Sequence, residues 1–159
     1  MGEMNDNVRA WIGIDPGKSG AMAVIRRDET LRPTLVPYTG PLCYVSNFYG
    51  LAAYGVRIVV ERLFARPGKL SSAKANFELG RCMGELETML SMCGIPFQEV
   101  TPQAWQKEFG ISGDKQTHVD CAKRLFPGVS LKRSDKCVKD FDGFADALLM
   151  AEYARRHMA

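Results

Sequence analysis

The 159-residue sequence has few of the patterns that define membrane, secreted and zinc-binding proteins. It contains no run of about twenty apolar residues, which is the length needed to cross a bilayer. Residues 1–7 lack the basic and apolar regions of a secretory signal peptide. We therefore expect a protein with no membrane partner that stays in the cytoplasm where it is made.

Side chains that form disulfides and zinc sites are also sparse. The five cysteines are odd in number, widely separated and without a CxxC pair, so we expect reduced cysteines that are mostly small core residues. The two histidines, His118 and His157, are far apart, and we interpret both as surface residues. Residues 17–19 read Gly-Lys-Ser, like the end of a P-loop. Because Ile12 stands where that motif requires its first glycine, no nucleotide cofactor is expected.

The composition is sufficient for one folded core. Hydrophobic residues make up 46% of the chain, which argues against disorder, and the length suits a single domain. We therefore expect one domain over residues 1–159, with residues 1–10 flexible. The formal net charge of +3 is mildly basic and by itself identifies no partner.

Apolar patterns and turn formers predict strands first and then alternating strands and helices. Strands are expected at 11–14, 21–26, 34–38, 57–61 and 95–100. Helices are expected at 41–54, 73–93, 102–109, 115–126 and 142–157. The strand 57–61 is nearly all apolar, as is typical of a strand buried on both faces. The pattern predicts an α/β fold in which helices flank a mixed central sheet of about five strands.

Four acidic residues stand where water-facing carboxylates are unexpected. Asp15 and Glu61 each end an apolar strand, and Asp142 and Asp146 lie one helical turn apart in the last helix. Each alone can be a turn former, a loop residue or a helix cap. Together, carboxylates that converge at the edge of a buried layer repel one another and lose solvation, so they need a cation. Oxygen ligands without a cysteine or histidine cluster favour Mg²⁺ or Mn²⁺ over zinc.

The same residues carry a resemblance to a known family. Residues 12–17 (Ile-Gly-Ile-Asp-Pro-Gly), 61–64 (Glu-Arg-Leu-Phe) and 142–148 resemble, in order, the motifs of RuvC-type Holliday-junction resolvases. The resemblance spans nearly the whole chain and implies an RNase H-like fold. The compact size is similar to phage-encoded members, which implies the cytoplasm of a bacterium or of a phage-infected host cell. The bacterial enzymes have their last acidic pair three residues apart, whereas Asp142 and Asp146 are four apart.

The resemblance implies a Mg²⁺-dependent endodeoxyribonuclease that resolves four-way DNA junctions by paired phosphodiester hydrolysis. Two Mg²⁺ ions, for which Mn²⁺ can substitute, are expected to be held by the four carboxylates, with Asp15 bridging them. In the family one lysine follows a proline by five residues and another opens the next helix. Lys107 and Lys115 occupy these positions. We expect Lys115 to be the catalytic cation and Lys107 to contact phosphate.

The loop after the second strand-end carboxylate is predicted to contact DNA. Arg62, Arg66 and Lys69 surround Phe64, and a basic segment with an aromatic side chain can hold phosphates and stack on an unpaired base. The resemblance implies that Phe64 wedges into the junction crossover. The alternative is that Phe64 folds back into the core.

The long helix 73–93 has two glycines, Gly80 and Gly84, on one face. Such glycines permit a close approach of DNA backbone, of a partner helix or of another segment of the same chain. A four-way junction has two-fold symmetry, so we expect a homodimer with this helix at much of its interface. Alternatively, the apolar side chains of the helix cover the sheet. These side chains are Met83, Leu86, Met89 and Leu90.

Other functions fit parts of this pattern. An actin-like kinase also begins with an Asp-x-Gly strand turn, but it needs two lobes and this chain supplies one. An RNase H-like nuclease could act instead on other branched DNA or on RNA–DNA hybrids, because carboxylates determine the reaction and not the substrate shape. A catalytically silent junction-binding protein is the third alternative, and the intact acidic set argues against it.

Overall fold

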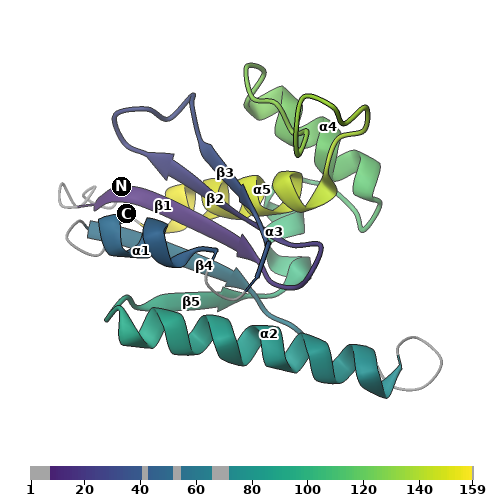
Figure 1. Ribbon diagram of the computed structural model, residues 1–159. Helices are drawn as coiled ribbons and strands as arrows, with labels where there is room; N and C mark the ends of the chain where they lie inside the picture. The colour runs from purple at the N-terminus through teal and green to yellow at the C-terminus, as the bar shows by residue number, and fades with distance from the viewer. Residues whose placement is uncertain (1–7, 41–42, 52–54, 66–71, 159) are drawn as a thin grey trace.

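The computed structural model describes residues 8–40, 43–51, 55–65 and 72–158. Within these ranges a five-stranded sheet is covered by helices on both faces (Figure 1). None of the helices described there is long and apolar enough to cross a membrane. The strands are β1 (Val8–Asp15), β2 (Ala21–Arg26), β3 (Thr34–Pro37), β4 (Gly55–Glu61) and β5 (Phe97–Val100). The helices are α1 (Val45–Leu51), α2 (Ala73–Met92), α3 (Pro102–Glu108), α4 (Lys115–Leu125) and α5 (Asp142–His157).

The sheet combines an antiparallel meander with parallel strands. β1 pairs antiparallel with β2, and β2 with β3, while β4 runs parallel to β1 and β5 runs parallel to β4. The spatial order is β3-β2-β1-β4-β5. This arrangement confirms the predicted α/β fold, with a mixed sheet of about five strands flanked by helices.

The sheet buries apolar side chains on both of its faces. Trp11 belongs to a core cluster with Leu148 of α5, whereas the next residue, Ile12, belongs to a second cluster with Leu86 of α2. Successive side chains of a strand point to opposite faces, which produces this alternation. Figure 1 accordingly shows α1 and α5 on opposite sides of the sheet. The apolar run at 58–60 in β4 follows from the same arrangement, because both of its faces are covered.

Gly13 allows α5 to lie directly against β1. A Cβ atom at this position would stand 2.2 Å from the carbonyl oxygen of Ala147 and 2.3 Å from the backbone nitrogen of Ala151. No side chain fits in that space. The glycine therefore sets how closely the strand that ends at Asp15 approaches the helix that carries Asp146.

Two predicted segments differ at their ends from the described elements. β1 begins at Val8, which is fully buried, so the first strand starts three residues before the predicted range 11–14. Residues 1–7 lie outside the described residues. The helix predicted over 41–54 is described as α1, and residues 41–42 and 52–54 lie outside the described ranges.

The apolar stripe of α2 packs on the sheet. Leu86 and Leu90 are buried, and Met89 packs against the same cluster, which confirms the alternative in which these side chains cover the sheet. Gly80 and Gly84 lie on the exposed side of the helix, and a Cβ atom at either would have no described atom within 4 Å. A close crossing within the described part of the chain therefore does not explain these glycines.

The five cysteines are free thiols, as expected. Cys82 and Cys121 are buried, and Cys43 and Cys93 pack against the core cluster that lies under α2. Cys137 is half-buried in the connector between α4 and α5. Most of the cysteines are thus small core residues.

Candidate active site

Two of the predicted carboxylates meet at one edge of the sheet. Asp15 is the last residue of β1 and Glu61 is the last residue of β4. These strands are parallel neighbours, and Ile14 is in register with Val60 directly before the two acids. Because parallel strands that are in register end at the same edge, both half-buried carboxylates emerge there.

The other two carboxylates come from the start of α5. Asp142 is the first residue of the helix and not its N-cap, since Phe141 occupies the cap position. The Asp146 side chain is only 3% exposed, whereas that of Asp142 is 45% exposed. A Cβ atom at Gly143 would stand 2.4 Å from the carbonyl oxygen of Ser19 in the β1–β2 turn. A carboxylate three residues before Asp146 would therefore not fit.

The four carboxylates are close enough to repel one another. Burial raises the pKa of Asp15 well above its ordinary value, and the charges of Glu61, Asp146 and Asp142 raise it further, while Lys115 opposes the rise. Burial also raises the pKa of Glu61, although a hydrogen bond from Trp105 partly offsets this rise. The edge of the sheet thus collects negative charge that the protein compensates only in part.

Lys115 supplies part of that compensation. It is the first residue of α4, whose N-cap Asp114 accepts a hydrogen bond from the backbone nitrogen of Gln116. Its ammonium nitrogen pairs with the Asp146 carboxylate and lies 3.4 Å from that of Asp142. Desolvation works against this charge, but the Asp146 carboxylate outweighs it and raises the pKa of Lys115 to about 12. Lys115 therefore stays charged at neutral pH.

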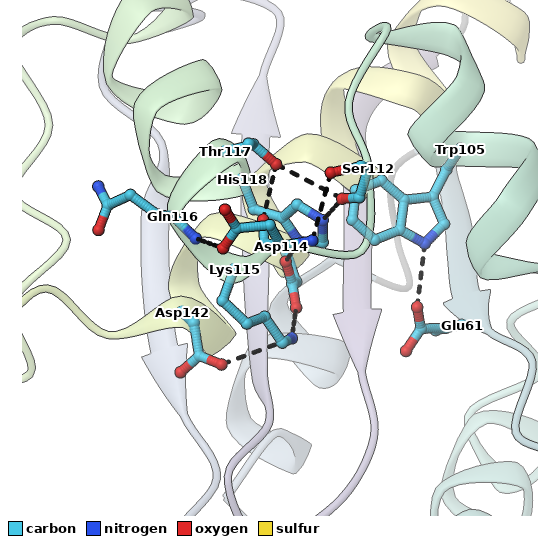
Figure 2. A network of polar contacts seen from close by, with 10 residues as sticks. Glu61, Trp105, Ser112, Asp114, Lys115, Gln116, Thr117, His118 and Asp142 are labelled. Atoms are coloured by element: carbon cyan, nitrogen blue, oxygen red, sulfur yellow. Dashed lines mark hydrogen bonds and ion pairs between the residues drawn. The ribbon is translucent and has the colours of Figure 1, made fainter.

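Two further side chains of the site were missed by sequence reasoning. His118 was predicted at the surface, but it is 2% exposed and its Nδ1 lies 2.6 Å from Oδ1 of Asp146. Burial disfavours charge on its imidazole, yet the hydrogen bond and charge of Asp146 raise the pKa of His118. Trp105 of α3 is fully buried and donates a hydrogen bond from Nε1 to Oε1 of Glu61 over 3.0 Å. Figure 2 shows Trp105 beside Glu61, and His118 in the same helix as Lys115, which reaches Asp142.

Sequence features that could have identified these residues are modest. His118 lies three and four residues before the buried Cys121 and Ala122, so it belongs to the apolar stripe of α4. It also lies one turn after Lys115 on the same side of the helix. His157, by contrast, is exposed at the end of α5, where its Nε2 lies 3.0 Å from a carboxylate oxygen of Glu108. The surface prediction is confirmed for His157 and wrong for His118.

The predicted DNA-contact residues are only partly described. Phe64 is 54% exposed, so it does not fold back into the core. The Arg62 guanidinium lies 5.6 Å from the centre of the Phe64 ring. Lys107 is exposed in the last turn of α3. Arg66 and Lys69 fall outside the described residues.

The donor set can be compared with the needs of a divalent cation. Within the described ranges, no three side chains of Asp, Glu, His or Cys stand close enough together to form a ready-made metal cage. The oxygen donors and their uncompensated charge nevertheless suit a hard cation such as Mg²⁺. Lys115 lies where it pairs with both acids of α5. Its ammonium would therefore have to yield to a cation that bound these two.

Solved structures of Holliday-junction resolvases share this architecture. The T. thermophilus RuvC structure in complex with a Holliday junction substrate is 17% identical with a TM-score of 0.55, covering 95% of this chain and 98% of its own. Another Thermus thermophilus RuvC structure is 18% identical with a TM-score of 0.51, covering 94% and 95%. The yeast mitochondrial Holliday junction resolvase Ydc2 is 15% identical with a TM-score of 0.51, covering 91% and 75%.

These similarities concern the fold. No family model and no curated protein sequence matches the chain. The structure has the RNase H-like fold of RuvC-type resolvases, over nearly the whole of two such proteins. The resemblance seen in the motifs is thus confirmed for the fold.

Proposed function

We propose that this protein is a metal-dependent endonuclease that resolves four-way DNA junctions by paired phosphodiester hydrolysis. The observation that carries the proposal is the convergence of Asp15, Glu61, Asp142 and Asp146 on one sheet edge, where burial and mutual repulsion raise the pKa of Asp15. The RuvC neighbour in complex with a Holliday junction substrate supports four-way DNA as the substrate class.

The carboxylates of this set would hold two Mg²⁺ ions, with Mn²⁺ able to replace them. When bound, such ions supply a nucleophilic water and neutralise charge on the phosphate. The pKa of Asp15 responds to the charges of Glu61 on β4 and of both α5 acids, so Asp15 would belong to both metal sites. Asp142, the most exposed acid of the α5 pair, would complete the set from the solvent side.

The basic and aromatic residues around this edge would bind the DNA. Lys115 remains protonated at neutral pH and would stabilise negative charge that develops on the phosphate. Lys107 and Arg62 are exposed and suited to contact the DNA backbone. For Arg66 and Lys69 the same role is proposed from the sequence alone. Phe64 would stack on a base at the crossover, since its ring is exposed beside Arg62.

Cleavage assays on a panel of substrates test this function. The purified protein is incubated with labelled four-way junction, linear duplex, flap and RNA–DNA hybrid, with Mg²⁺ and with EDTA. We expect Mg²⁺-dependent, paired cuts in opposed strands of the junction and little cleavage of the duplex. Preferential cleavage of flaps or hybrids would assign a different substrate to the same site. Junction binding without any cleavage would favour the catalytically silent alternative.

A further inference from the structure

The Glu61 carboxylate accepts a hydrogen bond from a buried indole, that of Trp105. The Trp105 side chain is fully buried, and its Nε1 hydrogen points at Oε1 of Glu61 over 3.0 Å. An indole N–H can only donate, and this one lies in an apolar core, so its preferred partner is the carboxylate. α3 thereby fixes the orientation of an acid that belongs to β4.

Asp146 is held in a similar way by His118. Nδ1 of the imidazole lies 2.6 Å from Oδ1 of Asp146, and Nε2 lies 2.5 Å from the backbone carbonyl of Ser112. A carbonyl oxygen can only accept, so Nε2 is the donor in the second contact. With partners at both nitrogens and 2% exposure, the ring has one orientation. It therefore sets the direction of the Asp146 carboxylate.

The two supporting rings also contact each other. The centres of the Trp105 and His118 rings are 5.2 Å apart and their planes meet at 73°, an edge-to-face contact. Glu61, Trp105, His118 and Asp146 thus form one continuous chain of contacts from β4 to α5. A displacement of either ring would be passed to both carboxylates.

We propose that Trp105 and His118 act together as positioning residues that fix the Glu61 and Asp146 carboxylates for a shared divalent cation. A metal site depends on the orientation of its ligands, and partners that orient ligands commonly contribute about 10- to 100-fold to metal affinity. This inference rests on the proposed function, because it assumes that these acids bind metal. It assigns a role to side chains of α3 and α4 that are too deeply buried to reach DNA.

Mn²⁺ binding to the purified protein without DNA tests the proposal. Dissociation constants are measured by electron paramagnetic resonance for the parent, Trp105→Phe and His118→Phe, all within the folded range of their melting curves. Phenylalanine keeps an aromatic ring and removes the nitrogen contacts. We expect each variant to bind Mn²⁺ about 10- to 100-fold more weakly. The double variant should lose Mn²⁺ affinity by a smaller factor than the product of the two single-variant factors, because the two rings contact each other.

Two further variants separate positioning from general packing. Trp11→Phe is the matched control, since Trp11 is also buried and donates from Nε1 to the carbonyl of Met158 over 3.1 Å, at the other end of α5. It should lower the melting temperature and leave the Mn²⁺ affinity unchanged. His118→Asn keeps a donor that can reach Asp146 and should recover much of the affinity lost in His118→Phe.

The outcomes distinguish this inference from the proposed function. One outcome would overturn the positioning role alone. In it, the parent protein cleaves junctions, and the folded Trp105→Phe and His118→Phe variants bind Mn²⁺ as tightly as the parent. If the parent protein binds Mn²⁺ but cuts no junction, the proposed nuclease function is refuted. Weaker Mn²⁺ binding by the two variants would still support the positioning role in that case.

Discussion

The imidazole of His118 lies 2.6 Å from the carboxylate of Asp146, and both side chains are almost fully buried. Asp146 is therefore an acid with fixed partners, since Lys115 pairs with it as well. Asp15 is in the opposite situation, because burial and neighbouring acids disfavour its charge. Two carboxylates of one site should thus respond differently to loss of their charge.

Asp15→Asn should stabilise the metal-free protein at neutral pH, whereas Asp146→Asn should destabilise it. The first change removes a repelled charge, and the second weakens a buried ion pair, which typically costs about 1–3 kcal/mol. For a chain of this size each kcal/mol corresponds to about 2–4 °C in melting temperature. Melting curves in EDTA at pH 7 measure both shifts. Equal shifts in the same direction would contradict the assigned environments.

The stabilising effect of Asp15→Asn should depend on pH. Because the pKa of Asp15 is raised in the folded state, folding holds this proton more tightly than the unfolded chain does. The contribution of Asp15 to stability is therefore most favourable in acid and falls as the pH rises through the raised pKa. The difference between variant and parent should be smaller at pH 5 than at pH 8 in the same EDTA buffer.

Asp15→Asn, Glu61→Gln and Asp146→Asn should each abolish junction cleavage and largely preserve junction binding. Each change removes charge needed to hold metal, but none removes a cation that contacts phosphate. Single-turnover cleavage and gel-shift assays on the same labelled junction measure the two properties. Near-normal turnover by any of the three would refute the metal-site assignment.

Lys115→Gln should abolish cleavage, lower the melting temperature in EDTA and tighten Mn²⁺ binding. The ammonium that pairs with Asp142 and Asp146 is lost, so the folded state loses an ion pair and the cation meets no competitor. Lys123→Gln is a matched control in the same helix, because Lys123 pairs with Asp140 over 2.6 Å. The control should keep its cleavage and its Mn²⁺ affinity. Weaker Mn²⁺ binding by Lys115→Gln would contradict the competition.

Phe64→Ala should impair junction cleavage more than binding to plain duplex, because an exposed ring can stack on an unpaired base. Its melting temperature should stay close to that of the parent, since little apolar area is lost from the core. Phe77→Ala serves as the control, with a phenylalanine that is 70% exposed on α2. An equal loss of junction cleavage in both variants would argue against a specific wedge.

The working form should be a homodimer with twice the 17.7 kDa chain mass in light scattering. One chain carries one carboxylate set, and paired cuts in a two-fold symmetric junction need two. The exposed side of α2 offers a test, since a Cβ atom at Gly84 would have no described atom within 4 Å. Gly84→Arg should therefore keep the fold and weaken the dimer. A monomer on the junction that still makes paired symmetric cuts would refute this prediction.

The strand-end carboxylates could be predicted from the sequence because local patterns determine them. Asp15 and Glu61 follow apolar runs, and parallel pairing of these runs brings their ends together. Asp146 could be predicted for a similar reason, since it interrupts the apolar stripe of a helix. These three acids can therefore be identified from short segments of the sequence.

The partners of these acids depend on contacts between distant segments. His118 has polar neighbours, Gln116 and Thr117, and its burial results from packing of α4 on α5 and beside Trp105. The bond from Trp105 to Glu61 joins residues 44 positions apart. The periodicity of α4 places His118 in the apolar stripe but does not identify its partner, so the contacts of the supporting residues are seen only in the folded chain.

Gly143 excludes a three-residue spacing of the last two acids. An α-helix turns about 100° per residue, so an acid four positions before Asp146 stands about 40° from it around the axis, and one three positions before stands about 60° away on the other side. The Ser19 carbonyl blocks a side chain at position 143, three residues before Asp146, whereas Asp142 is four residues before it. A search pattern that requires two acids exactly three residues apart would not match residues 142–146. A pattern that allows the acid and the neighbouring glycine to exchange positions would match them.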